Sequence, residues 1–484
     1  MKKLLGMALI LALVIPATWS NAEILKNIKV GGSVDLQANS ADNITNMDSA
    51  RNDRIGDVVT RVLLNTSWDL LDDMHANITL RKNDRAWGTT GAGGQKNNGD
   101  QGLLGLQTNS SALDNTMIGV ANIKVDKLAG NFDATIGRQT YGDPGDLIVY
   151  YGPKTAYGLY ATAIDGFRVD WANDSLGFTG IAAKTTGNAI ATVGTGKDVD
   201  MRGIELMAKN LPVKLGLRIY NAVKHMTGAG TNPALTPNDN LWVYGLKAKA
   251  EGGGGWFQAQ IAMNSGENRN IDRVTAGTIK GNGGSYTGKA LMVDAGYKAD
   301  VSNVGAFTPW VNFGYGTGRK SYDEGTNEGF TDIASGYAPG IINGRFNAAG
   351  PAATRLYSNS LTGGTNGVDT LGLNNRVVYG LGVKVTPTAA DKLVAGIGFW
   401  DYRFQAATDD PSNLNGQAFE SALKNKHIGS EIGLTVDWKH SENVMYGVGL
   451  AKFMPGGFIK ETARTMGAGN NPATLAFADL SLKF

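Results

Sequence analysis

The 484-residue sequence contains no cysteine, only 13 prolines and 4 histidines, and no long apolar run after residue 17. Without cysteine the chain forms neither disulfides nor thiolate metal sites, which suits an exported protein that uses neither. The best later apolar run, Leu393 to Trp400, is far shorter than the roughly 20 apolar residues of a membrane-spanning helix. A helical membrane protein is therefore excluded.

An excess of charge of one sign is also missing. Lysine and arginine total 45, and aspartate and glutamate total 43. A nucleic-acid-binding protein normally has a basic excess, so no nucleic-acid partner is expected. None of the four histidines stands in a recognisable catalytic motif, and the glycine clusters lack the Lys-Ser/Thr and helix of a phosphate-binding loop. The chain is therefore predicted not to be an enzyme, and to have no catalytic residue, metal site or cofactor.

Residues 1–22 have the features of a cleaved signal peptide. Lys2 and Lys3 form a positive segment, Leu4 to Ala17 form an apolar segment, and Ser20 and Ala22 are the small residues of a cleavage site. The remaining 462 residues, 23–484, contain equal numbers of basic and acidic side chains. This composition predicts an exported chain that forms one large unit or about three ordinary domains.

Residues 23–484 are rich in glycine (67 in the whole chain) and divide into about eighteen segments in which apolar and polar residues alternate. Clear examples are Val58 to Leu70, Val213 to Tyr220 and Ile428 to Trp438. Alternation with a period of two is typical of β-strands with one apolar and one polar face. The number of strands depends on where the segment boundaries are drawn, and the sequence predicts 16 to 18 of them. A β-sandwich shows the same alternation, so alternation alone does not decide the fold.

The connections between these segments alternate between short and long, and this order decides the fold. A strictly alternating order places all short turns at one end of an antiparallel sheet and all long loops at the other, as in bacterial outer-membrane barrels. Short turns are expected at Leu71–Asp73, Lys127–Gly130, Ala172–Ser175, Asn210–Pro212, Gly252–Gly255, Asp300–Gly305, Pro387–Ala390 and Lys439–Glu442. The longest loops are expected near 86–115, 140–163, 265–288 and 319–374.

The sequence therefore predicts an all-β protein, an antiparallel up-and-down transmembrane barrel integral to a Gram-negative outer membrane. The apolar faces then contact lipid and lipopolysaccharide, and the polar faces surround a lumen. The short turns are expected to be periplasmic and the long loops extracellular. The final strand ends in Phe484, which resembles the C-terminal signal read by the outer-membrane assembly machinery. Tryptophans near strand ends are expected to form interfacial girdles, namely Trp68, Trp171, Trp242, Trp310, Trp400 and Trp438.

Charged residues of both signs occupy the polar faces that point into this lumen. One interpretation is that they pair across neighbouring strands and only keep the lumen wet. The other is that guanidinium groups line a path for anionic or polyhydroxylated solutes. The candidate pore-lining residues on these faces are Arg61, Arg81, Arg168, Asp170, Glu205, Arg218, Arg376, Lys384 and Glu431.

The stretch Thr135 to Trp171 resembles the alginate-export porin family. It contains a strand ending in Gly137-Arg138-Gln139, a Gly/Asp-rich loop, and a strand that opens with Asp165-Gly166 and includes Arg168. The resemblance implies a passive conduit for an acidic polysaccharide, with Arg138 and Arg168 in the pore. Arg138 and Ile136 are two residues apart and therefore share a parity, which means that they lie on the same face of the strand, here the apolar face. Either a bulge turns Arg138 inward, or it lies at the extracellular rim.

Two functions remain open from the sequence. The first is a channel for the passive passage of small or polymeric hydrophilic solutes, with an anionic polysaccharide such as alginate as one candidate. The second is a barrel closed by its loops that serves as a surface receptor, adhesin or scaffold for a partner protein. The segment Arg319–Asn374, which includes Arg345 and Arg355, either folds into the lumen or stands outside as a contact surface.

Overall fold

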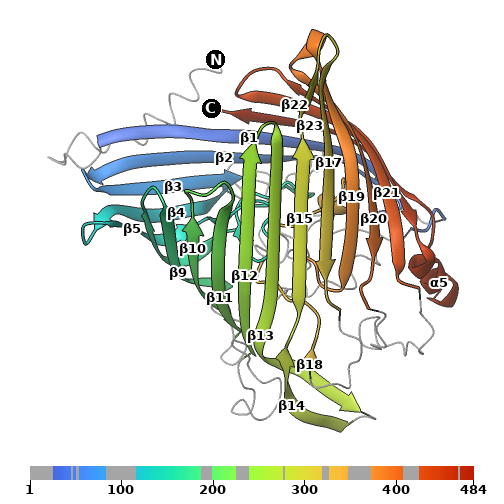
Figure 1. Cartoon of the computed structure of the whole chain (residues 1–484), viewed down its shortest axis with the longest axis horizontal. Helices are drawn as coiled ribbons and strands as arrows, with labels where there is room; N and C mark the ends of the chain where they lie inside the picture. The colour runs from blue at the N-terminus through green and yellow to red at the C-terminus, as the bar shows by residue number, and fades with distance from the viewer. Residues whose placement is uncertain are drawn as a thin grey trace.

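The computed structural model describes residues 26–44, 47–50, 54–82, 116–186, 199–224, 239–275, 278–318, 326–346, 372–406, 425–466 and 469–484. Most of these residues lie in antiparallel β-strands (Figure 1). The helical elements in these ranges include α3 (Ile342–Arg345), α5 (Gly457–Met466) and the 3-10 turn η3 (Thr388–Ala390). No described helix combines the length and the apolar character that crossing a membrane requires.

Eighteen strands in the described ranges form one closed ring, as the sequence predicts. Each strand pairs with the next one along the chain, and the last strand pairs with the first. The ring consists of β1 (Lys26–Asp42), β2 (Ile55–Leu71), β3 (Met74–Lys82), β4 (Thr116–Leu128), β5 (Phe132–Gln139), β8 (Ile164–Ala172), β9 (Leu176–Thr186), β10 (Val199–Ala208), β11 (Lys214–Lys224), β12 (Asp239–Gly252), β13 (Gly255–Thr275), β15 (Lys289–Tyr297), β17 (Gly305–Gly316), β19 (Arg376–Pro387), β20 (Leu393–Arg403), β21 (His427–Lys439), β22 (Val444–Pro455) and β23 (Ala473–Lys483).

Short turns and long connections are sorted between the two ends of the ring. The eight expected short turns all join consecutive ring strands at one end, which we call the turn rim. The opposite end, the loop rim, carries the longer connections. The expected loop 265–288 contains a hairpin instead, because β13 continues beyond the ring and pairs with β14 (Thr278–Tyr286). β14 and β18 (Thr326–Asn327) project beyond the ring in Figure 1. The expected loop 86–115 lies outside the described residues.

The outer face of the ring is apolar, as expected for a wall in contact with lipid. Leucine, isoleucine and valine side chains on the outer parity are exposed on strand after strand, including Leu246, Val311, Leu381, Leu434 and Leu450. Four of the six expected girdle tryptophans share this outer parity, namely Trp68, Trp171, Trp242 and Trp438.

The girdle prediction is wrong for Trp310 and Trp400. The neighbouring residues Val311 and Phe399 are exposed on the outer face, so the alternation of the strand turns both indoles into the lumen. Their rings pack against each other there, with centroids 5.4 Å apart. The apolar character of tryptophan suggests a lipid-facing position, but the parity of the strand decides the side.

The buried apolar core lies inside the ring. Its fully buried members include Ile148, Ile333, Phe330 and Phe346, which belong to the connections after β5 and after β17. A barrel of this width has a lumen too wide for wall side chains to fill, so chain from the loops supplies the packing. The short strands β6 (Tyr141–Gly142) and β7 (Tyr150–Tyr151) form part of this inner layer, whereas β16 (Ala299–Val301) extends the wall at the turn rim.

Because the chain has no cysteine, single cysteines can test the orientation of the two rims. Lys460 lies exposed on α5 at the loop rim, and Asp300 lies exposed on β16 at the turn rim. We expect Lys460→Cys to react with a bulky, membrane-impermeant maleimide on intact cells, and Asp300→Cys to react only after the outer membrane is permeabilised. Labelling of Asp300→Cys on intact cells would reverse the assignment of the rims.

Phe484 lies at the seam where the ring closes. Its backbone N–H donates to the Gly32 carbonyl oxygen (3.1 Å) and its own carbonyl oxygen accepts from the Gly32 N–H (2.8 Å). Its side chain is 55% exposed at the apolar end of β23. We expect Phe484→Asp to lower the yield of folded, heat-modifiable barrel in the outer membrane, because the carboxylate is unfavourable in this apolar band. An unchanged yield would show that the terminal aromatic ring has no part in assembly.

Candidate functional site: the luminal constriction

The connection between β5 and β8, residues 140–163, crosses the lumen; we call it the first inward loop. On one side, Arg61 of β2 donates through Nη1 to the Lys154 (2.6 Å) and Leu159 (3.1 Å) carbonyl oxygens. On the other side, Asp146 contacts β11 and β12, which lie nearly opposite β2 in the ring. A loop held by opposite walls narrows the lumen.

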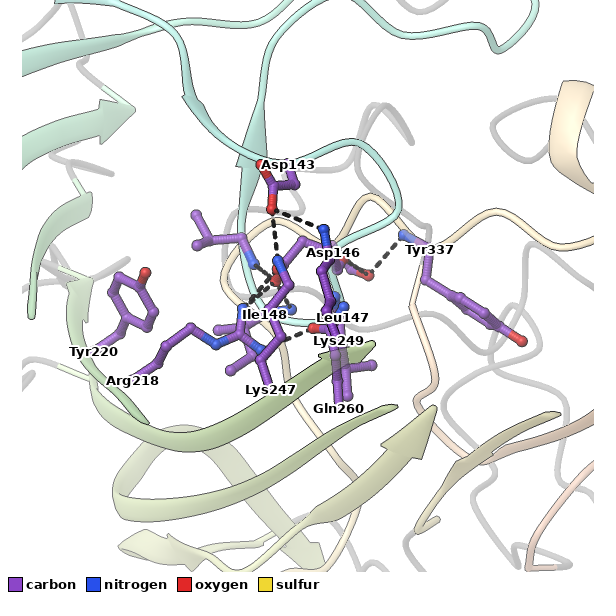
Figure 2. A network of polar contacts seen from close by, with 12 residues as sticks. Asp143, Asp146, Leu147, Ile148, Arg218, Tyr220, Lys247, Lys249, Gln260 and Tyr337 are labelled. Atoms are coloured by element: carbon purple, nitrogen blue, oxygen red, sulfur yellow. Dashed lines mark hydrogen bonds and ion pairs between the residues drawn. The ribbon is translucent and has the colours of Figure 1, made fainter. Parts of the chain in front are cut away.

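Asp146 is the centre of a buried network of charges (Figure 2). Its Oδ2 lies 2.6 Å from Arg218 Nη1 and 3.1 Å from Lys247 Nζ. Lys247 also contacts Asp143 Oδ2 at 2.6 Å, and Arg218 Nη2 donates to Gln260 Oε1 at 2.8 Å. Only 1% of the Arg218 residue is exposed. The loop is therefore fixed to β11, β12 and β13 by side chains that are shielded from water.

The backbone of the loop completes the environment of Asp146. Its Oδ1 accepts hydrogen bonds from the N–H groups of Ile148 (2.9 Å) and Val149 (3.3 Å). Burial alone would raise the pKa of the Asp146 carboxyl, but the positive charges of Arg218 and Lys247 and these two N–H groups hold the pKa below its ordinary value. The carboxylate is thus ionised at neutral pH and remains paired with both cations.

Part of the connection between β17 and β19, residues 328–346, enters the lumen after β18 and forms the second inward loop. Glu431 of β21 accepts hydrogen bonds from the N–H groups of Ile341 (2.5 Å) and Ile342 (2.8 Å), at the start of α3. At the end of α3, Arg345 donates through Nη2 to Asp479 of β23 (2.5 Å). This part of Arg319–Asn374 therefore folds inward. Arg355 lies outside the described residues.

The two inward loops contact each other and form one unit. Val149 and Ala334 pair as a parallel bridge, and the Tyr150 N–H donates to the Ala334 carbonyl oxygen at 2.7 Å. The Asp146 carbonyl oxygen accepts from the Gly336 N–H at 2.7 Å. Burial raises the pKa of the Tyr337 phenol well above its ordinary value, and this hydroxyl donates to Asn312 Oδ1 on the wall (2.8 Å). We call this unit the luminal constriction.

Several of the expected pore-lining residues anchor the constriction. Arg61, Arg218 and Glu431 hold loop backbone or loop side chains as described above. Arg81 donates to the Ala161 carbonyl oxygen of the first inward loop. Arg376 interacts electrostatically with Tyr337 of the second inward loop and with Tyr402 of the wall. The structure brings these five residues together through the loops.

The other expected residues lie on the luminal wall or outside it. Arg168 Nε lies 2.7 Å from Asp170 Oδ2, and Asp170 also accepts from Thr179 Oγ1, so the two side chains pair along the wall. The Arg168 guanidinium also lies over the ring of Tyr141 in the first inward loop, 5.7 Å from its centroid. Glu205 lies opposite Arg218 in the register of β10 and β11. Lys384 is exposed on the inner parity of β19.

Arg138 does not face the lumen. It shares its parity with Ile136, which is 54% exposed on the outer face, and its Nη1 lies 2.8 Å from Asp165 Oδ2 on the neighbouring strand. Gly137 has φ +119°, yet the pairing of β4 with β5 continues across it without a register shift. Of the two alternatives for Arg138, the structure therefore shows the rim position on the outer face. This removes Arg138 from the candidate site.

The sequence did not predict three residues of the charge network at the centre of the site, namely Asp146, Lys247 and Gln260. Asp146 stands in a loop with no alternation, so nothing local marks it as buried. Lys247 and Gln260 lie on inner parities of β12 and β13 and were within reach of the same parity argument that found Arg218. Within the described ranges, no group of three or more histidine, aspartate or glutamate side chains is arranged to hold a metal ion.

A closed 18-strand antiparallel ring with an apolar outer face, a polar wall and inward loops defines an outer-membrane β-barrel of the porin type. The chain is accordingly an integral protein of a Gram-negative outer membrane. No protein-family profile and no curated protein matches the sequence.

Solved structures of outer-membrane proteins share this fold. The outer membrane protein OprD from Pseudomonas aeruginosa matches with a TM-score of 0.52 at 10% identity, over 96% of this chain and 96% of that one. OccAB1 from Acinetobacter baumannii matches with a TM-score of 0.51 at 9% identity, over 96% and 99%. OccK2 (OpdF) from Pseudomonas aeruginosa, solved in complex with glucuronate, matches at 0.50 and 10%, over 95% and 99%. At such identities the likeness shows the fold, and it does not single out the alginate-export family.

The Asp146 network predicts which change releases the first inward loop. Asp146→Asn leaves Arg218 and Lys247 without their shared carboxylate, and breaking a buried ion pair in this way typically costs about 3–5 kcal/mol. We expect trypsin to cleave after Lys154, which is buried in the folded loop, while the ring of strands remains intact.

Asp165→Asn provides the matched control. It removes the pair with Arg138 on the outer face, where an exposed pair contributes at most about 1 kcal/mol. Cleavage after Lys154 is measured by mass spectrometry of the purified protein in detergent. Equal resistance of Asp146→Asn and the unmodified protein would show that the network does not hold the loop.

Proposed function

We propose that the barrel is a channel for the passive passage of small hydrophilic solutes across the outer membrane. The observation that supports this most directly is the luminal constriction: one loop is fixed to the charged, polar wall by a buried ion pair, and the other by hydrogen bonds to the buried carboxylate of Glu431. A narrowing that is held in place selects solutes by size and charge, whereas a loose loop does not. Nothing in this arrangement requires catalysis, and we infer a transport role rather than an enzymatic one.

We propose anionic saccharides as the solute class. The similar barrel OccK2 was solved in complex with glucuronate, which is a sugar acid, and alginate is a polymer of sugar acids. Arg168 and Lys384 are the candidate cations that remain on the wall of this lumen. Asp170 offsets the charge of Arg168, so the wall favours anions only moderately. Export of an alginate-like polymer is the narrower form of this proposal.

A second candidate function is a barrel closed by its loops that acts as a surface receptor, adhesin or scaffold. The observation in its favour is the dense apolar packing of the inward loops, in which Ile148, Phe330 and Phe346 are fully buried. Planar-bilayer conductance of the purified protein separates the two candidates. A stable ion current supports the channel, and its absence in correctly folded protein supports the closed barrel.

Contacts outside the lumen are part of the same proposal. The apolar outer face contacts lipid and lipopolysaccharide, and Phe484 at the end of β23 is the candidate contact for the assembly machinery. Neither contact involves the luminal wall. Assembly and transport therefore depend on separate sets of residues, which allows luminal variants to be tested in normally folded protein.

The charge of Arg168 predicts how selectivity changes. Arg168→Ser leaves Asp170 unbalanced in the lumen, so we expect the anion-to-cation permeability ratio to fall. The measurement is the reversal potential of the purified channel in a salt gradient. Arg138→Ser is the matched control, because it removes the same charge from the outer face and should leave the reversal potential unchanged. If the two variants behave alike, Arg168 has no part in ion selection.

A further inference from the structure

Among the described residues, three tryptophans face the lumen on one side of the barrel. Trp256 lies on β13, Trp310 on β17 and Trp400 on β20. In each case the next residue along the strand or the one before it, such as Phe257, Val311 or Phe399, is exposed on the outer face. Other large side chains of the inner face, such as Tyr220 and Tyr402, are buried against the inward loops. The rings of Trp256 and Trp310 remain partly exposed and call for a separate explanation.

The three indoles lie flat against this wall because glycines stand beside them. The cross-strand register forms one continuous row on the inner face, and its members are Trp256, Gly296, Trp310, Gly382 and Gly398. A Cβ atom at Gly296 would come within 2.6 Å of the Trp256 ring, and one at Gly382 would come within 2.6 Å of the Trp310 ring. The glycines therefore leave room for each ring to rest its face on the backbone of its neighbour.

The three rings differ in exposure, and Trp400 lies one inward register closer to the loop rim than this row. Trp400 is 9% exposed, and Trp310 is half-buried against it with the ring planes inclined by 37°. Trp256 is 38% exposed and lies close to the turn rim. Ile341 of the second inward loop reaches Gly433, two strands beyond Gly382 in the same row. The row thus runs from beneath the constriction to open lumen on the side of the turn rim.

Polar groups border the row on both sides. Thr308 and Lys384 form the neighbouring inward-facing pair on the side of the turn rim. Gln258 and Asp294 form the neighbouring inward-facing pair on the side of the loop rim. A flat apolar surface with hydrogen-bonding groups along its edges is the arrangement found in small-molecule sites. A pyranose ring matches this arrangement, because its C–H faces are apolar and its hydroxyl groups lie around its edge.

We propose that Trp256 and Trp310 form a stacking subsite for the pyranose ring of a carbohydrate on the turn-rim side of the constriction. The strands that carry them are separated by one strand, which places their backbones about 10 Å apart. Trp400 supports Trp310 from the side covered by the loop. This inference rests on the proposed channel function, since it names a class of solute that the lumen favours.

The experiment compares a ring with an open chain of the same size and charge. Glucose and glucitol are both neutral six-carbon polyols, and only glucose presents a pyranose face. Binding to the purified barrel in detergent is followed by saturation-transfer NMR, and residence in the pore by current noise in planar bilayers. We expect the unmodified protein to favour glucose, and Trp310→Ala or Trp256→Ala to lower that preference by about threefold to tenfold.

Two further variants make the test specific. Trp310→Phe keeps an aromatic face and should retain part of the preference for glucose. Trp242→Ala removes a tryptophan of the outer face, where it stacks on Tyr244, and should leave the preference unchanged. If Trp310→Ala does not fold, Trp256→Ala and Trp310→Phe still decide the outcome.

Equal binding of glucose and glucitol to the unmodified protein would overturn the subsite. An unchanged preference in Trp256→Ala and Trp310→Ala would do the same, and would leave the indoles with a packing role only. Failure of the channel proposal is distinguishable, because it appears as absence of ion current in simple salt. The NMR comparison does not depend on current and decides the subsite in either case.

Discussion

The structure depends on one constraint, which is that no backbone N–H or C=O group can remain unpaired in contact with lipid. An open sheet has two unpaired edges, and closure into a ring removes both. Here the closing contact is the antiparallel pairing of β1 with β23, from Ser33 opposite Lys483 to Asp42 opposite Thr474. Closure also fixes the parity of every strand, because a one-residue slip would turn an apolar face into the lumen.

Closure of eighteen strands has a second consequence, which is a lumen that wall side chains cannot fill. The inward loops occupy it, and their polar backbone then needs partners away from bulk water. Arg61 and Glu431 provide such partners from different strands of the wall, and Arg218 binds the carboxylate of the loop residue Asp146. Buried charges of this kind are stable only as sets, so Asp146, Arg218 and Lys247 depend on one another. The ionic network is thus a result of the width of the barrel.

The sequence predicts those features that repeat and does not predict those that occur once. Strand alternation and the sorting of turns recur many times, so single errors do not change the predicted barrel. The inward loops depend on contacts such as Arg218 with Asp146, which lie 72 residues apart and leave no periodic signal. The family resemblance places Arg138 in the pore, whereas the alternation of its strand places it on the outer face. The structure agrees with the alternation. Residue type places Trp310 and Trp400 in the girdle, again against their parity.

The luminal charges form two groups: buried charges that hold the loops, and exposed charges that can contact a solute. A guanidinium whose two terminal nitrogens already donate to Asp146 and Gln260, as in Arg218, cannot also bind a passing solute through them without releasing the loop. Side chains that still face water can contact a solute without releasing a loop, and they include Lys384, Trp256 and Trp310. The number of luminal arginines is therefore a poor measure of anion preference in this barrel. Selectivity must arise from the smaller set of groups that the constriction leaves exposed, and in that set flat aromatic faces stand beside single charges.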